Sequence, residues 1–366
     1  MKIDYRFKIL YAVGIIMVCF GHTWGGGISL MTDWFPLGGF LIGMFVFCSG
    51  YFYRDKAEEN VGGYVLKKVK SLLVPLYIYN LVYGVLVMAS RHWGFTIGED
   101  ISLYNLTIAP FTTGHQFIYT MAAWFIAPLF MVEVYNVCLR KLVHLIWKNA
   151  PEWLFFVIGL AIGIGGCQLS IMGYNGVGWG LCLVRFMYFV PFYGLGCLYR
   201  RVLEQWDRKI PSFWYFVCVC GAQLAIICVY GAAPEYAISW CTGFEQGPVL
   251  PFVVGFISIA FWLRVAGILE PVIGRSKWIN LIADNTFPIM MNQFVGFMLV
   301  KGLLGLITPE FDWASFKSDI WYYVEPFGIW QAMVLYVIGG IVVSLVIAWG
   351  VKKVKRAIRH VAGNIT

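Results

Sequence analysis

Long apolar runs recur ten times along this chain, and they constrain its fold more than any other feature. A helix needs about 20 apolar residues to cross the hydrocarbon core of a bilayer. The chain is 60% hydrophobic and 13% charged, whereas about a quarter of the residues of a soluble domain are charged. We therefore predict an all-α, polytopic transmembrane helix bundle of about ten spans. The predicted spans are 8–26, 36–53, 72–90, 120–139, 152–171, 179–199, 212–231, 248–268, 281–305 and 328–351.

The loops between these runs alternate in charge, and the alternation predicts an orientation. Twenty-three of the 27 Lys and Arg residues lie in six clusters on one side, at 2–8, 54–70, 140–148, 200–209, 264–277 and 352–359. The other side holds Arg91, Lys301 and Lys317. Because cytoplasmic loops carry the excess of basic residues, both termini are predicted to be cytoplasmic. The same clustering accounts for the net charge of +8 without a nucleic-acid partner.

Loops and cysteines add no further domain and no metal site to this prediction. The longest loops, about 54–71 and 91–119, are too short for an independent core, so 1–366 is predicted to be one domain without an appended soluble domain. Most of the cysteines lie in or beside apolar runs, where thiols behave as small hydrophobes. The pair Cys167 and Cys241 lies on one predicted side, which leaves a single disulfide open. No His or carboxylate accompanies Cys218 and Cys220, so no metal is expected.

A histidine ends the first apolar run, and ionisable residues at membrane depth are rarely without a role. His22 follows Leu10–Gly21 and falls in the outer half of the predicted span. One interpretation is an interfacial side chain satisfied by water. The functional interpretation is a general base, because an imidazole with a pKa near 6.5 can accept a proton from a hydroxyl.

Other polar residues interrupt the later spans. Arg185 must face a polar cavity or a partner, since arginine keeps its charge; it is either snorkelling or a donor to an anionic or sugar group. The adjacent amides of Asn292 and Gln293 must hydrogen-bond within the bundle or to a ligand. In the outer loop, His115 and Gln116 are either solvated or part of an acceptor site.

Basic residues precede the third span. Lys67, Lys68 and Lys70 would commonly anchor the chain to anionic membrane lipids. Alternatively, they form a landing site for an anionic cytosolic co-substrate.

Six segments follow one another in this order: Gly14–His22, Leu41–Phe52, Lys67–Pro75, Tyr119–Leu129, Arg185–Gly196 and Asn285–Gln293. Taken in this order, they resemble the acyltransferase 3 family of integral-membrane O-acyltransferases. The resemblance runs from residue 6 to about residue 300 and implies the ten-helix frame of that family. Ser49, Trp124 and Tyr188 lie in the matching segments, and we assign them to the candidate substrate site.

Two positions depart from the family pattern. Members usually carry Arg or Lys eleven residues before the first-helix histidine, where this chain has Tyr11. Lys8, about 40° around the same helix from His22, would supply the missing charge. The late-helix histidine of the family is replaced by Asn292 or Gln293. Lys8, Tyr11 and the lysines at 67, 68 and 70 are the predicted cofactor-binding residues.

The resemblance implies transfer of an acyl group, usually acetyl, from acyl-CoA to a hydroxyl of a glycan or other small acceptor. His22 would act as the base, and Arg185, Asn292 or Gln293 would stabilise the oxyanion. A covalent acyl-histidine variant stays open. The resemblance also implies the bacterial inner membrane.

Two other classes fit the same spans. A glycan or lipid-precursor transporter or flippase would also need interior polar residues, although no inverted repeat is visible. An inactive relative acting as a sensor or assembly partner would tolerate the two departures. The sequence leaves the oligomeric state open, a homodimer included.

Overall fold

The computed structural model of the chain describes residues 3–23 and 33–363, and these residues form helices and no strand. This confirms the predicted all-α class. Within these described residues, eight helical segments are long and apolar enough to cross a membrane, which fits a multi-pass membrane protein. The eight segments are Val61–Arg91, Met121–Ile146, Glu152–Ile171, Trp179–Asp207, Ser212–Tyr230, Leu250–Ile273, Thr286–Gly305 and Ile329–Ala357.

The first two predicted spans correspond to shorter helices. Helix α1 (Tyr5–Gly21) has 17 residues and α2 (Leu37–Tyr51) has 15, fewer than the about 20 that cross the hydrocarbon core. The total of ten spans therefore stays a prediction. Residues 24–26, the end of the first predicted span, lie outside the described residues.

Several spans are built from consecutive helical pieces. Wide π-helical turns at Val69–Leu73 and Tyr199–Leu203 join neighbouring helices without breaking the rod. The remaining bounds are α3 Lys56–Glu59, α4 Val61–Lys68, α5 Val74–Arg91, α6 Leu103–Thr107, α7 Ala109–Thr112, a 3₁₀ turn Met121–Phe125, α8 Ile126–Ile146, α9 Glu152–Ile171, α10 Trp179–Leu198, α11 Glu204–Asp207, α12 Ser212–Tyr230, α13 Leu250–Ile273, α14 Lys277–Ala283, α15 Thr286–Gly305, α16 Trp313–Ser318 and α17 Ile329–Gly363.

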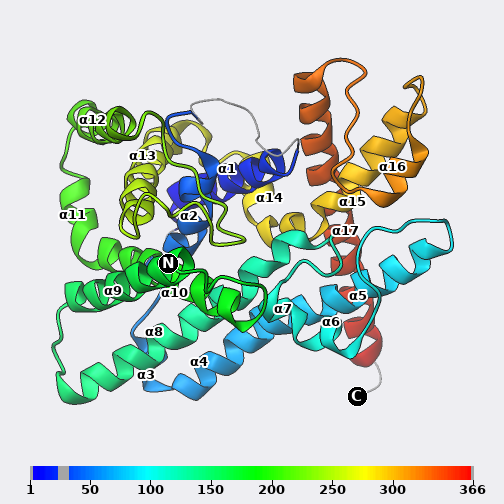
Figure 1. Cartoon of the computed structure of the whole chain (residues 1–366). Coiled ribbons are helices and arrows are strands. Elements are labelled where there is room, and N and C mark those ends of the chain that lie inside the picture. Colours follow the sequence, from blue (N-terminus) through cyan, green and yellow to red (C-terminus); the bar gives the residue numbers. More distant parts are fainter. Residues whose placement is uncertain (1–2, 24–32, 364–366) are drawn as a thin grey trace.

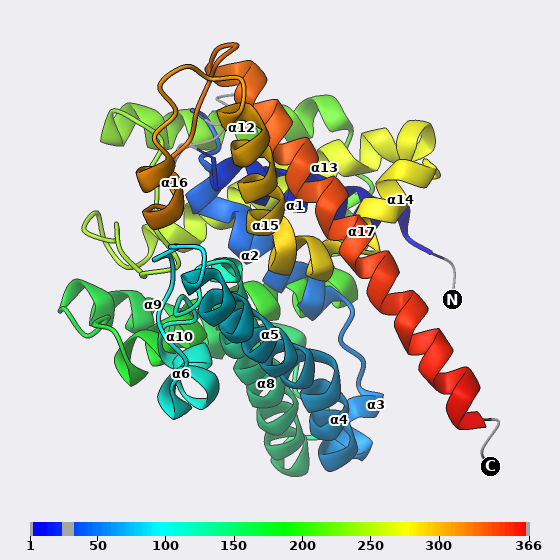
Figure 2. The same ribbon diagram turned by 90° about the vertical axis from the view of Figure 1, so that its right-hand side faces the viewer.

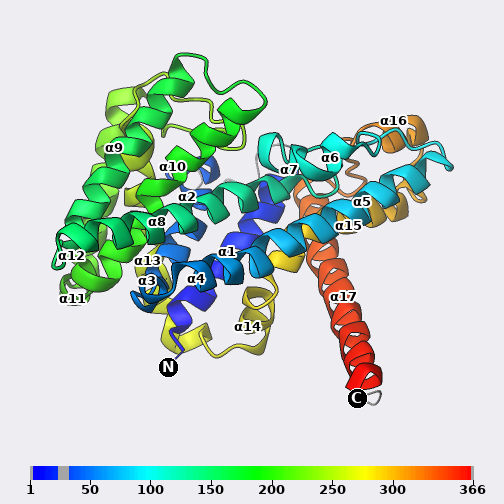
Figure 3. The same cartoon turned by 90° about the horizontal axis from the view of Figure 1, so that it is seen from below.

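Helices α1 and α2 lie in the middle of the bundle. Figure 1 shows α12 and α13 on one side of them and α15 and α17 on the other, and Figure 3 shows the same order from below. The start of α1 and the end of α17 lie toward the same edge in Figures 2 and 3. This common side agrees with termini in one compartment; that the compartment is the cytoplasm stays a prediction.

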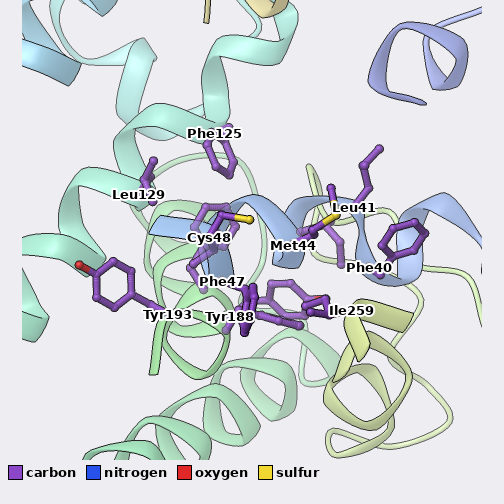
Figure 4. Packing of buried hydrophobic residues seen from close by; sticks show 14 of the residues in the cluster. Phe40, Leu41, Met44, Phe47, Cys48, Phe125, Leu129, Tyr188, Tyr193 and Ile259 are labelled. Atoms are coloured by element: carbon purple, nitrogen blue, oxygen red, sulfur yellow. The ribbon is translucent and has the colours of Figure 1, made fainter. Parts of the chain in front are cut away.

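Helix α2 is buried on most of its circumference, unlike a lipid-facing span. Ten of its 15 residues are buried. Figure 4 shows its side chains Phe40, Met44 and Phe47 packed among residues of the neighbouring helices, Tyr188 of α10 and Ile259 of α13 included.

Close backbone approach fixes α2 against α10. A Cβ on Gly50 would lie 2.1 Å from the carbonyl oxygen of Tyr193, and one on Gly196 would lie 2.1 Å from that of Phe47. Small residues allow membrane helices to pack this tightly. The crossing holds the C-terminal end of α2, and with it Ser49, at a fixed place in the bundle.

The connection between α12 and α13 folds back onto the N-terminal end of α2. A Cβ on Gly38 would lie 2.2 Å from the carbonyl oxygen of Tyr236, so only glycine fits there. A single bridge between Ala237 and Thr242 closes the tip of this connection. Segment 235–243 thereby becomes part of the wall of a central cavity.

Candidate active site

A cavity of about 790 Å³ lies between α1, α2, the start of α8, α15 and segment 235–243. Four of the predicted site residues line it, namely Tyr11, His22, Ser49 and Trp124. Its wall is otherwise mainly apolar, as in most pockets for small molecules. Tyr11 and His22 are eleven residues apart on one helix, so the cavity follows about 16 Å of the α1 axis.

His22 stands at the C-terminal end of α1. Its backbone N–H donates to the carbonyl oxygens of Val18 and Cys19, both at 3.2 Å, which closes the last turn of the helix. Its ring lies 5.1 Å from the ring of Phe294, centroid to centroid. The imidazole is therefore carried by a helix end and packed on one side by α15.

Gln293 orients the ring of His22. The Nε2 of this amide donates to the carbonyl oxygen of Met290 at 3.2 Å, which turns its Oε1 toward His22 Nδ1, also at 3.2 Å. An amide oxygen only accepts hydrogen bonds, so Nδ1 must carry the hydrogen. The other ring nitrogen, Nε2, then has a free lone pair, as a general base requires.

The neighbouring amide has a different environment. Asn292 Oδ1 accepts from the hydroxyl of Tyr83 at 2.7 Å. Its Nδ2 donates to the Pro288 carbonyl oxygen at 2.6 Å and to the Tyr79 hydroxyl at 3.3 Å. The side chain is 2% exposed and does not line the cavity. These contacts favour the packing interpretation for Asn292.

Tyr323, which packs against Lys301, holds the backbone of His22. The hydroxyl of Tyr323 donates to the carbonyl oxygen of His22 at 2.6 Å. The ammonium of Lys301 lies 4.0 Å from the centre of the Tyr323 ring and donates to the carbonyl oxygen of Ile320. The sequence assigned Lys301 to the outer basic residues, but it is buried in α15 at 1% exposure.

Arg185 is fully buried and donates to backbone carbonyl oxygens, which favours neither snorkelling to solvent nor direct contact with a ligand. Its Nε donates to the Ser239 carbonyl oxygen at 2.9 Å and its Nη1 to that of Thr113 at 3.0 Å. The guanidinium lies 4.8 Å from the ring centre of Trp124. Arg185 does not line the cavity, but Trp124 and Ser239 do. It thus joins two outer segments behind the wall.

The remaining outer candidates lie off the cavity wall. His115 packs edge-on against Trp240, with centroids 4.9 Å apart, and its Nε2 is buried without a hydrogen-bond partner. Burial, with the nearby charge of Arg185, lowers the pKa of His115 to about 3. Gln116 donates to Asn80 Oδ1 at 2.6 Å in a buried network. Tyr188 is 1% exposed and stacks on Phe244 with centroids 5.7 Å apart, which makes it a core residue.

A polar cluster lies behind Ser49, at the end of the cavity away from His22. Glu133 Oε1 accepts from Ser49 Oγ and from Lys68 Nζ, both at 2.7 Å. The carboxylate is buried, and its Oε2 has no hydrogen-bond partner. The sequence analysis missed Glu133, although an acid within an apolar run was a usable signal.

The lysines predicted to bind the acyl donor fall into two groups. Lys8 pairs with Asp284 and Lys68 with Glu133, so their charges are already partly neutralised. Exposed Lys67 and Lys70 border a separate groove of about 390 Å³ together with Ser71. Leu72, the next residue, lines the central cavity. The π-helical turn Val69–Leu73 therefore separates a basic groove from the cavity.

Cysteines and metals play no visible part in this site. Cys167 and Cys241 are buried free thiols, so the single disulfide that the sequence left open is not formed. Within residues 3–23 and 33–363, no group of three or more His, Cys, Asp and Glu side chains is placed to hold a metal ion.

Comparison with known proteins identifies the family. The model of the acyltransferase 3 family, described as an acyltransferase domain, matches residues 4–352 of the 366 residues. No curated protein and no solved structure gives a significant match. The chain therefore belongs to the acyltransferase 3 family of membrane acyltransferases.

Proposed function

We propose that this protein transfers an acyl group, most simply acetyl, from cytosolic acyl-CoA to a hydroxyl of a glycan or related small acceptor. The observation that carries the proposal is the cavity that joins His22 at one end to Ser49 and Tyr11 toward the other. In this proposal the donor enters from the predicted cytoplasmic side and the acceptor from the opposite side. The family resemblance supports the bacterial inner membrane as its location and polysaccharide modification as its role.

His22 is the proposed general base. Its Nε2 takes the proton of the acceptor hydroxyl while the oxygen attacks the thioester carbonyl carbon, forming a C–O bond. The C–S bond then breaks, and the leaving thiolate takes the proton back from the imidazolium. Gln293 keeps the correct nitrogen protonated throughout, because its Oε1 accepts from Nδ1. Gln293 and Arg185 are positioning residues in this scheme, since neither lines the cavity.

On the donor side, the phosphates of CoA would bind Lys67 and Lys70, which are exposed beside the groove. Lysine ammonium groups bind phosphate as point charges. The thioester arm would pass the π-helical turn Val69–Leu73 toward Ser49 and Tyr11. Lys68 lies deeper, on Glu133, and helps to fix the inner end of the cavity.

The test uses the purified protein in vesicles, with labelled acetyl-CoA supplied on the inner side and methyl glycosides on the outer side. His22→Ala should lower transfer by at least a hundredfold, in the range for loss of a general base. Donor binding should stay within twofold. His92→Ala, an exposed loop histidine, is the matched control and should keep full transfer. Full transfer by His22→Ala would refute the proposed base.

The same experiment separates the competing functions. A transporter would carry the glycoside across the vesicle membrane without acylation and would not bind acetyl-CoA saturably. An inactive relative would bind no acceptor and give no product. Saturable donor binding that weakens in a Lys67→Glu, Lys70→Glu double variant favours the enzyme.

A further inference from the structure

The predicted outer end of the cavity presents one carboxylate to a ligand. Among the described residues that line the cavity, Glu235 alone has a side chain charged at neutral pH, and it is exposed. Ser239 and Thr242 of the same segment also line the wall. A ligand entering past segment 235–243 therefore meets a carboxylate and hydroxyl-bearing residues.

The predicted outer side as a whole carries more carboxylates than basic side chains. Nine of the 19 carboxylates lie in segments on the predicted outer side, and all nine are exposed. They are Asp33, Glu99, Asp100, Glu235, Glu245, Glu310, Asp312, Asp319 and Glu325. A surface with one dominant sign of charge raises the local concentration of opposite charges and lowers that of like charges.

The basic side chains on this side keep their charges, but the donors of Arg185, Lys301 and Arg91 that the structure describes bind the protein. Arg185 and Lys301 are buried and donate to backbone carbonyl oxygens. Arg91 donates to the carbonyl oxygens of Phe95 and Gly98 and pairs with the Asp100 carboxylate at 3.3 Å. Lys317 is partly exposed but does not line the cavity. No described cation in the wall is therefore available for an anionic acceptor.

We propose that the acceptor site selects hydroxyl compounds that are uncharged or cationic, and that Glu235 disfavours acceptors with a carboxylate or phosphate near the reacting hydroxyl. This inference rests on the proposed function for the identity of the site. Specificity of this kind arises from a repulsive element as much as from attraction.

Two sugars that differ by one charge test the inference. Methyl glucuronoside and its uncharged amide have the same ring and the same hydroxyls. In low salt, the amide should be preferred by about three- to tenfold in kcat/KM, as expected for one charge pair in a partly aqueous site. The preference should shrink at high ionic strength, because salt screens exposed charges.

Variants assign the preference to one side chain. Glu235→Gln should reduce the preference by about threefold, and Glu235→Lys should reverse it. Glu245→Gln, an exposed carboxylate that does not line the cavity, is the matched control and should keep the wild-type preference. The inference would be overturned if Glu235→Gln left the ratio of the kcat/KM values for the two sugars unchanged.

Direct binding of both sugars to the protein in nanodiscs, measured by saturation-transfer NMR, distinguishes failure of the inference from failure of the proposed function. Selective binding of the amide without acylation would refute the proposed transfer and keep the charge selection. Three results would overturn the charge selection: acylation of both sugars with equal efficiency, equal binding of the two sugars in low salt, or binding of neither sugar.

Discussion

Replacing Gln293 by leucine tests whether the ring of His22 is held for catalysis. The substitution keeps the approximate volume of the side chain and removes the oxygen that accepts from Nδ1 at 3.2 Å. The ring then either keeps a buried N–H without a partner or rotates to find a new one. In either case, only a minority of the molecules keep the arrangement in which the free Nε2 lone pair can act as the base.

The expected magnitude follows from that one hydrogen bond. A neutral hydrogen bond contributes about 1 kcal/mol net, and an unsatisfied buried donor costs about 1–3 kcal/mol. Converted to rate, this range is a roughly five- to hundredfold loss of kcat. The KM for the acceptor should change by less than about twofold, because Gln293 does not line the cavity.

The assay is steady-state acyl transfer in vesicles, with the melting temperature of each variant measured in parallel. Gln293→Glu keeps an acceptor oxygen and should restore most of kcat. Gln223→Leu removes another buried amide, which contacts the Trp34 carbonyl oxygen outside the cavity, and should leave kcat unchanged. A Gln293→Leu variant with wild-type kcat and a normal melting temperature would refute the orienting role.

Two further predictions concern the outer side. Burial and the charge of Arg185 lower the pKa of His115 from 6.5 to about 3 in the folded protein. As the pH falls, the unfolded chain therefore binds a proton at His115 before the folded protein does. Stability present above pH 6.5 should therefore be lost toward pH 3, by about 2 kcal/mol between pH 7 and pH 5. The free energy of unfolding of His115→Gln, measured by denaturant titration at the two pH values, should not show this loss. An equal loss in the wild-type protein and in the variant would contradict the prediction. Tyr323→Phe removes the donor to the His22 carbonyl oxygen but keeps the ring beside Lys301, so we expect a roughly threefold to tenfold lower kcat with an unchanged melting temperature. A wild-type kcat in Tyr323→Phe would show that the hydrogen bond from Tyr323 to His22 does not matter for transfer.

The apolar runs predicted the helices well because burial in lipid leaves helices as the favoured solution for a single segment. Each predicted span has a helical counterpart, but the helical segment Val61–Arg91 begins before the predicted span 72–90 and takes in part of the predicted loop 54–71. Hydropathy did not show that α1 and α2 would be short and central, because their composition resembles that of lipid-facing helices. Their shortness depends on what packs around them.

The site was only partly visible in the sequence. The anomaly of a histidine at membrane depth indicated His22, and the structure places it on the cavity wall. Its partners, Gln293 and Tyr323, lie hundreds of positions away on the chain, and only tertiary contacts bring them together. Arg185 was noticed for its charge, but its acceptors are backbone carbonyl oxygens, which no side-chain pattern encodes.

The shortness of the two central helices has an electrical consequence. With 17 and 15 residues, α1 and α2 span about 25 Å and 22 Å, against about 30 Å of hydrocarbon. Water that enters from either side would narrow the insulating layer, so the membrane potential would fall over a shorter distance there. One elementary charge moved through 100 mV changes in energy by about 2.3 kcal/mol. We therefore expect the proton that moves between the acceptor hydroxyl and His22 to sense part of this field, so that energised and de-energised vesicles differ in transfer rate.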